Sequence, residues 1–267
     1  MSRILQISDC HVVAPGQRAN RVVDTGAALE DTVATINRLL PQIGPVDAVI
    51  VTGDLTDNGT PEEYARSRDI LSALTLPWLA VPGNHDQREP MRRAFADARW
   101  MPEHGPIRWR LDLPDLAVLA LDTLVEGGAH GALSEACLDW LAAELATLAP
   151  KPVLVALHHP PVATGILPMD RINLREADGL RRVLDAYPGE RRLLCGHVHR
   201  CITGRFGSTP CQIAPGTSHA VTANLREDNP NSLTFEPNGM LLHEYRDGLM
   251  SNLLPIGDFD GPHRFGG

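Results

Sequence analysis

Histidines, aspartates and one asparagine recur in five short segments of this sequence, each directly after a predicted strand. The segments offer imidazole nitrogens together with carboxylate and amide oxygens, and they contain no pair of thiolates. Such a donor set suits Zn, Mn, Fe or Co better than Ca. Taken singly, each segment could also be an ordinary turn or a structural histidine. The candidate metal ligands are Asp9, His11, Asp54, Asn84, His158, His197 and His199.

The candidate ligands outnumber the positions around one four-coordinate ion. Two ions that share a ligand would use the whole set. In phosphoryl hydrolysis, two-metal sites activate water and stabilise both the attacking and the leaving oxygen. Asp54 is the candidate for the shared ligand, because one carboxylate can bridge two cations. It follows the apolar run Val49–Val51 and a turn at Gly53. The imidazole of His85, beside Asn84, adds a titratable group.

These segments require a sheet that brings distant strand ends together. Arg3–Ile7 and Val46–Val51 are predicted strands. The helix between them is expected to be capped by Asp24 or Thr25, to run to Leu40 and to stop at Pro41. A β-α-β unit makes its two strands parallel neighbours. The carboxyl ends of parallel strands meet at one edge of a sheet, where ligands bind in α/β proteins.

Further strands and helices alternate along the chain to residue 195. Helices are predicted where a capping residue precedes an amphipathic run, and strands where aliphatic residues form short runs. The predicted helix caps are Thr60 (helix to about Leu74), Ser134 (to Leu148) and Asn173 with Glu176 (to Tyr187), and Asp86 is a candidate cap near Arg88. The predicted strands are Trp78–Val81, Leu116–Leu121, Val153–Leu157 and Arg192–Cys195.

Two pairs of candidate ligands are separated by a single residue, Asp9-x-His11 and His197-x-His199. In extended backbone, the two members of such a pair point to the same side. We therefore expect each pair to face the site together from the end of its strand.

The pattern of the sequence changes after Cys201. Short β runs alternate with Gly, Pro and Asn turns, as in antiparallel hairpins. The segment Pro215–His219 could return a loop to the site, which makes His219 a candidate catalytic residue. Asp122 follows a strand without a histidine beside it and is interpreted as structural. His130 lies in a glycine-containing loop and is expected to be exposed.

Composition narrows the classes of partner and compartment. The chain has 267 residues, 43% of them hydrophobic, and a net charge of −9, so we expect no binding of a nucleic acid polymer. No apolar run is long enough to span a membrane, and the amino terminus lacks a signal-peptide core. Five scattered cysteines suit a reducing compartment. We expect a cytoplasmic protein with a small substrate and no membrane partner.

The ordered set of segments is similar to the motifs of the calcineurin-like metallophosphoesterases. The resemblance spans residues 1 to about 220 and is closest to bacterial class III cyclic-nucleotide phosphodiesterases and glycerophosphodiesterases. It implies an α/β fold, a four-layer α/β/β/α sandwich with a small C-terminal β-hairpin cap. It also implies a catalytic domain at residues 1–224 and a cap or oligomerisation segment at residues 225–267. The matching segments are Asp9-x-His11, Gly53-Asp54, Gly83-Asn84-His85-Asp86, His158-His159 and Gly196-His197-x-His199.

The resemblance further implies a role for each matching residue. Asp54 would bridge two divalent ions (Mn, Fe, Co or Zn). His85 would stabilise the transition state or donate a proton, and His219 could assist. The implied reaction is in-line attack of a metal-bridging hydroxide on a small phosphodiester, a cyclic nucleotide or a glycerophosphodiester. One ion would be held by Asp9, His11, Asp54 and His199, and the other by Asp54, Asn84, His158 and His197.

Other functions are compatible with the same ligands. A phosphomonoesterase or a phosphonate-ester hydrolase would need the same metals, whereas a nuclease would be expected to show a basic groove. A metal-free interaction scaffold is disfavoured, because every ligand position holds a residue able to coordinate. The resemblance also implies a homo-oligomer, since several relatives assemble through the carboxyl-terminal segment.

Overall fold

The computed structural model describes residues 1–266, and two β-sheets form its centre. The first sheet has the strand order β13-β12-β1-β2-β3 and the second the order β4-β5-β6-β7-β9-β8. The first contains β1 (Ser2–Ile7), β2 (Ala48–Thr52), β3 (Trp78–Val81), β12 (Gly239–Tyr245) and β13 (Leu249–Pro255). The second contains β4 (Trp109–Asp112), β5 (Ala117–Ala120), β6 (Val153–Ala156), β7 (Arg191–Cys195), β8 (Ile202–Phe206) and β9 (Thr209–Ile213).

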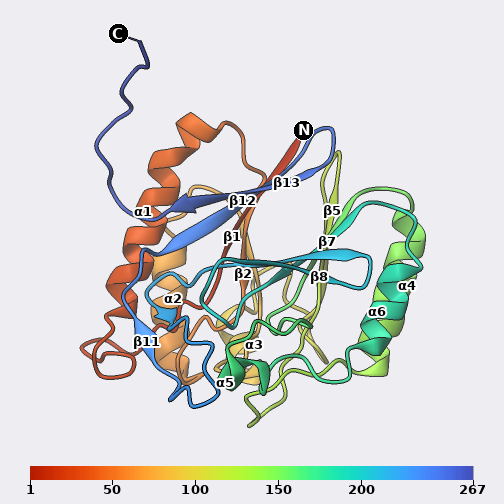
Figure 1. Cartoon of the computed structure of the whole chain (residues 1–267), viewed down its shortest axis with the longest axis horizontal. Helices are drawn as coiled ribbons and strands as arrows, with labels where there is room; N and C mark the ends of the chain where they lie inside the picture. The colour runs from red at the N-terminus through yellow and green to blue at the C-terminus, as the bar shows by residue number, and fades with distance from the viewer. Residues whose placement is uncertain (267) are drawn as a thin grey trace.

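Helices cover the outer face of each sheet. In Figure 1, α1 and α2 lie on one side of the sheets, and α4 and α6 lie on the opposite side. This arrangement confirms the four-layer α/β/β/α sandwich. The helices are α1 (Thr25–Ile43), α2 (Pro61–Leu71), α3 (Arg88–Ala94), α4 (Glu135–Leu148), the short α5 (Leu167–Asp170) and α6 (Asp178–Asp185).

Three apolar layers hold the sandwich together. Successive residues of a strand point to opposite faces, so Ile50 of β2 packs between the two sheets, while Val49 and Val51 pack against the helices of the first sheet. In β6, Leu154 packs between the sheets and Val155 packs against α4 and α6. Each such buried side chain contributes about 1.5–3 kcal/mol. Burial on both faces explains why these strands are continuous apolar runs.

The predicted β-α-β unit is confirmed, because β1 and β2 pair in parallel. The predicted stop at Pro41 is wrong, since α1 continues to Ile43 with Pro41 inside its last turn. A proline this close to a helix end removes only one hydrogen bond. The helix instead ends at Gly44, which has a φ of 76° and donates its N–H to the carbonyl of Leu40.

Three predicted caps are confirmed and two are wrong. Asp24 caps α1, where its side chain accepts the Ala27 N–H. Thr60 caps α2, and Ser134 caps α4 by accepting the Cys137 N–H. Asn173 does not cap a helix: its side-chain amide donates to the Val162 carbonyl, and α6 begins only at Asp178. Asp86 does not cap α3, whose N-cap is Gln87; the buried Asp86 carboxylate instead accepts the N–H groups of residues 55, 56 and 83. In both cases tertiary partners outcompete the local cap.

The C-terminal hairpin completes the first sheet. β12 pairs antiparallel with β1, and β13 pairs with β12 as the edge strand. Residues 239–255 thus share a sheet with the first strand of the chain. A second, smaller ribbon is formed by β10 (Ala220–Val221) and β11 (Leu233–Thr234). No helix of the described residues has the length and apolar character to cross a membrane.

A buried histidine ties β12 to β1. The amide nitrogen of Gln6 donates to Thr52 and to the Cys195 carbonyl, so its carbonyl oxygen accepts from His243 Nε2 at 2.9 Å. His243 Nδ1 then accepts from the Ser251 hydroxyl at 2.7 Å. These partners fit the neutral imidazole, and burial lowers the pKa of His243 to about 3.

This network predicts a loss of stability in mild acid. In the unfolded chain, His243 has an ordinary pKa of about 6.5, whereas in the folded chain its pKa is about 3. The unfolded chain therefore binds one more proton between these two pH values, so the unfolding free energy falls as the pH drops through this window. Between pH 7.5 and 5.5, the wild type should lose about 1.4 kcal/mol more unfolding free energy than His243→Gln in urea titrations. Equal losses in the two proteins would contradict the neutral buried imidazole.

Candidate metal centre

The predicted ligands gather at the carboxyl ends of the central strands, around one cavity of about 640 Å³. Asp9 and His158 are fully buried and do not line it. The convergence expected from the parallel sheets is therefore seen in the structure. The candidate residues that line the cavity are His11, Asp54, Asn84, His85, His197, His199 and His219.

Asp54 lies at the centre of this group. Its Oδ1 accepts the backbone N–H of His85 at 2.9 Å. Its Oδ2 lies 3.4 Å from His11 Nε2 and 3.3 Å from His158 Nε2. One carboxylate oxygen thus faces nitrogen donors on both sides, as a ligand shared by two ions requires. Gly83 packs directly against Asp54, and a Cβ at this glycine would collide with the carboxylate.

Electrostatics hold Asp54 ionised. Burial alone would raise its pKa, yet the pKa lies well below the usual value because the imidazoles of His158 and His85 face the carboxylate. Burial lowers the pKa of His158, but Asp54 outweighs this effect and raises the pKa to about 9. The His158 imidazole has to lose its proton before it can bind a metal ion.

Asp9, His11 and His199 form one cluster of donors on the first side of Asp54. The Nε2 atoms of His11 and His199 are 3.1 Å apart, and His199 Nε2 is 3.5 Å from Asp9 Oδ1. Asp9 Oδ1 also accepts the backbone N–H of His197 at 2.9 Å, which connects the first strand end to the loop after β7. Burial, followed by the proximity of His11, lowers the pKa of His199 well below its usual value and favours the unprotonated imidazole that binds metals.

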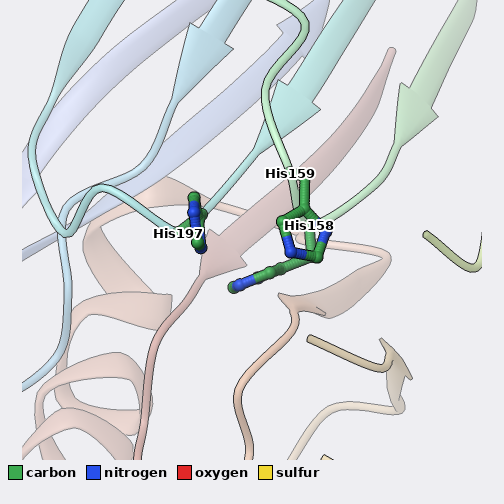
Figure 2. Close-up of side chains that lie close together, drawn as sticks. All are labelled: His158, His159 and His197. Carbon is green, nitrogen blue, oxygen red and sulfur yellow. The ribbon is translucent and has the colours of Figure 1, made fainter. Parts of the chain in front are cut away.

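His158, His159 and His197 form a second cluster on the other side. Figure 2 shows that two of these imidazoles follow β6 and the third follows β7. His158 donates Nδ1–H to the Thr52 carbonyl at 2.8 Å, which directs its Nε2 toward Asn84 Oδ1 at 3.2 Å. Such a bond to a backbone carbonyl orients metal-binding histidines. His159 was not among the sequence-based candidates.

The expectation that Asp9/His11 and His197/His199 lie in extended backbone is wrong. Their φ angles are 56°, 47°, 73° and 52°, and Asp54 has a φ of 51°. Positive φ costs such residues about 1–3 kcal/mol each and is concentrated at functional sites. The sharp turns divide only the second pair: His197 joins the second cluster, whereas His199 joins the first, which holds both Asp9 and His11. The backbone thus places neighbouring histidines around different donor groups.

His85 stands at the mouth of the cavity and is held by Asp57. Its Nδ1 lies 2.8 Å from the Asp57 carbonyl oxygen, so Nδ1–H donates and Nε2 is left free. The Asp57 carboxylate accepts from His11 Nδ1 at 3.1 Å, which directs His11 Nε2 toward Asp54. Asp57 was missed in the sequence. Its position three residues after Asp54, in the same loop, was the available signal.

The structure also places the remaining candidates. His219 reaches the cavity with its ring centre 4.5 Å from that of His199, and burial together with His199 and His11 lowers its pKa to about 3. Asp122 is structural, as predicted: it forms an ion pair with Arg88 and accepts the backbone N–H of Ile107. His130 is half-buried rather than exposed, and it does not line the cavity.

The buried donor atoms fit metal ions. Four buried nitrogen and oxygen atoms of the two clusters have no hydrogen-bond partner among the described residues. Each unsatisfied buried polar atom costs about 1–3 kcal/mol, and coordination would offset this cost. The atoms are Asp9 Oδ2, His159 Nε2, His197 Nε2 and His199 Nδ1.

Comparisons with known proteins agree with this geometry. Residues 2–201 match the family model described as calcineurin-like phosphoesterase. The chain is 36% identical over 265 residues to a probable glycerophosphodiester phosphodiesterase of Arcobacter nitrofigilis, covering 98% of this chain and 96% of that protein. It is 30% identical over 262 residues to a cAMP/cGMP dual specificity phosphodiesterase of Mycobacterium tuberculosis, covering 95% and 79%. A crystal structure of a dimetal phosphatase from Danio rerio superposes with a TM-score of 0.59 at 15% identity, covering 96% and 99%.

A sandwich of two sheets that gathers imidazoles and carboxylates at its strand ends defines a class of metal-dependent hydrolases. The chain belongs to the calcineurin-like phosphoesterase family. The family resemblance and the fold expected from the sequence are both confirmed.

Proposed function

We propose that this protein is a phosphodiesterase that hydrolyses small phosphodiesters, such as glycerophosphodiesters or cyclic nucleotides, with two divalent ions. The observation that carries the proposal is the position of Asp54 Oδ2, between His11 Nε2 and His158 Nε2. The names of the two phosphodiesterase relatives support the substrate class. The proposed ligands are Asp9, His11, Asp54 and His199 for one ion and Asp54, Asn84, His158 and His197 for the other.

Divalent ions at these ligands would supply Lewis-acid activation of water and neutralise charge that develops on phosphate oxygens. The protein's own groups hold the substrate and move protons. His85 directs Nε2 into the cavity, where it can stabilise the phosphate or protonate the departing alkoxide. His219 lies within reach of the same region and can assist. Mn, Fe, Co and Zn all suit the nitrogen and oxygen donors.

The charge of the cavity favours a diester over a monoester. A diester carries one negative charge at neutral pH, whereas a monoester carries nearly two. None of the described residues that line the cavity is Lys or Arg, so no side chain offers a fixed positive charge for a second phosphate charge. A metal-free scaffold is disfavoured for a separate reason, because it would leave three buried donor atoms of the proposed ligands unsatisfied, Asp9 Oδ2, His197 Nε2 and His199 Nδ1.

A comparison of two aryl phosphates tests the proposal. Protein loaded in turn with Mn, Fe, Co and Zn should hydrolyse bis(p-nitrophenyl) phosphate with a higher kcat/KM than p-nitrophenyl phosphate. Metal analysis should find two ions per chain. A preference for the monoester would assign a phosphomonoesterase instead. Failure to bind metal, together with the absence of both activities, would leave the scaffold as the better function.

Location and assembly extend the proposal. We propose a cytoplasmic homo-oligomer that binds neither membranes nor nucleic acid polymers. The five free cysteines suit a reducing compartment, and the net charge of −9 opposes binding of polyanions. The edge strand β13 exposes Met250 and Leu253, which could contact a second copy. Sedimentation of the metal-loaded protein distinguishes an oligomer from a monomer.

A further inference from the structure

The outer wall of the cavity is built by two segments that carry no metal ligand. One is the loop 13–23, and the other is the β10–β11 ribbon with its connection, residues 220–234. The family match ends at residue 201, so the ribbon lies outside it. The loop 13–23 lies inside the matched residues, so the wall joins one segment of the family match to one beyond it.

Apolar packing and hydrogen bonds fix this wall in place. Leu233 of β11 packs on the small cluster formed by Val13, Ala19 and Val23, which joins the two segments. The carbonyl of Val221 accepts from the guanidinium of Arg200, the residue next to His199, at 2.7 Å. The wall is thus attached to the turn that presents a proposed metal ligand, and its position relative to the ions is set by the fold.

Two asparagines of the wall offer free amides to the cavity. Asn20 comes from the loop and Asn231 from the ribbon, and both line the cavity with exposed side chains. Among the described residues, no hydrogen bond involves either side-chain amide, and Asn231 is held through its backbone N–H, which donates to Asn229 Oδ1 at 3.0 Å. Both residues have positive φ angles, 49° and 51°, a conformation that asparagine tolerates better than most residues. The fold therefore holds two amides beside the metal centre that no structural role uses.

The chemistry of the wall selects a kind of substrate. An amide both donates and accepts hydrogen bonds, which complements a hydroxyl group. Among the described residues that line the cavity there is no Lys or Arg to pair with a second anion, and the aromatic rings there are all imidazoles of the metal centre. Val221 and Leu233 offer a short apolar surface to a carbon chain. These features suit a small, uncharged polyol.

We propose that Asn20 and Asn231 form a subsite that binds the free hydroxyl groups of a glycerol-like alcohol in the phosphodiester. The inference rests on the proposed phosphodiesterase function and deepens it, because it names the part of the substrate that this chain selects. The metal ligands act on the phosphate, whereas the two amides distinguish one alcohol from another.

The test uses two esters that share one leaving group. Glyceryl p-nitrophenyl phosphate carries free hydroxyls, and propyl p-nitrophenyl phosphate does not. The wild type should prefer the glyceryl ester by about 10-fold in kcat/KM, and Asn20→Gly and Asn231→Gly should each reduce this preference by about 3–10-fold, the effect of one hydrogen bond. Glycine removes the amide and accepts the positive φ. Arg21→Gly is the matched control: Arg21 also has a positive φ, 64°, but does not line the cavity, so the preference should stay within about twofold.

Each outcome has a defined consequence. An equal fall for both esters in the two asparagine variants, or a wild type that cleaves both without preference, would overturn the subsite and leave the phosphodiesterase function standing. A metal-loaded wild type that cleaves neither ester would overturn the proposed function, and this inference with it.

Discussion

Replacing Asp54 by asparagine should remove at least one metal ion per chain and nearly abolish turnover. The substitution keeps the shape of the side chain but replaces one of its two oxygen acceptors by an NH₂ group, which can only donate. Because Oδ1 accepts the backbone N–H of His85, the carbonyl oxygen of the introduced amide would stay there, and its NH₂ group would face His11 Nε2 and His158 Nε2. A donor would then occupy the side where both ions are proposed to bind.

The expected loss is large because two effects combine. Removal of one electrostatic contact to a transition state lowers kcat by about 10²–10³-fold, and the loss of an ion adds to this. We expect kcat/KM for a phosphodiester to fall by more than about 10³-fold. Metal content should fall from two ions per chain to one or none.

A matched control separates this effect from the loss of one negative charge. Asp112→Asn removes a carboxylate of the second sheet that pairs with Arg110 at the surface, away from the cavity. It should keep both ions and normal turnover. Full metal occupancy with sustained turnover in Asp54→Asn would remove Asp54 from its bridging position, and the proposed two-ion site would need another shared ligand.

The layered fold could be predicted because its physical signals are local in the sequence. Runs such as Val153–Leu157 are apolar on both faces, and Thr60 and Ser134 cap helices with their own neighbours. The errors arose where distant partners decide. Asn173 binds the Val162 carbonyl instead of capping a helix, and the enclosed Asp86 gathers backbone donors from residues 55, 56 and 83.

Residue types identified the candidate donors, but the sequence could not show how the backbone presents them. Spacing suggested that His197 and His199 face the same way, whereas positive φ angles send them to different clusters. Asp57 was missed because its function depends on contacts with His11 and His85, and neither contact has a sequence signature. The wall residue Asn231 was missed for the same reason, since only the packing of the ribbon brings it to the cavity.

Replacing His85 by alanine should leave both ions bound and slow turnover by about 10²–10⁴-fold, the usual contribution of a positioned proton donor. His85 has a half-exposed side chain at the cavity mouth and is not a proposed ligand. Its backbone N–H, which holds Asp54, survives the substitution. His104→Ala, at an exposed position outside the cavity, is the control and should change neither metal content nor rate.

The dependence on the leaving group distinguishes the two roles open to His85. If its imidazole protonates the departing alkoxide, His85→Ala should harm an alkyl ester far more than a p-nitrophenyl ester, because nitrophenolate leaves without a proton. If it stabilises charge on the phosphate, both esters should slow equally. Unchanged turnover of both esters in His85→Ala would exclude this residue from the reaction.

Asp57→Asn should behave differently, since it weakens the bond to His11 Nδ1 but keeps the carbonyl that holds His85. We expect it to reduce metal affinity by about 10–100-fold.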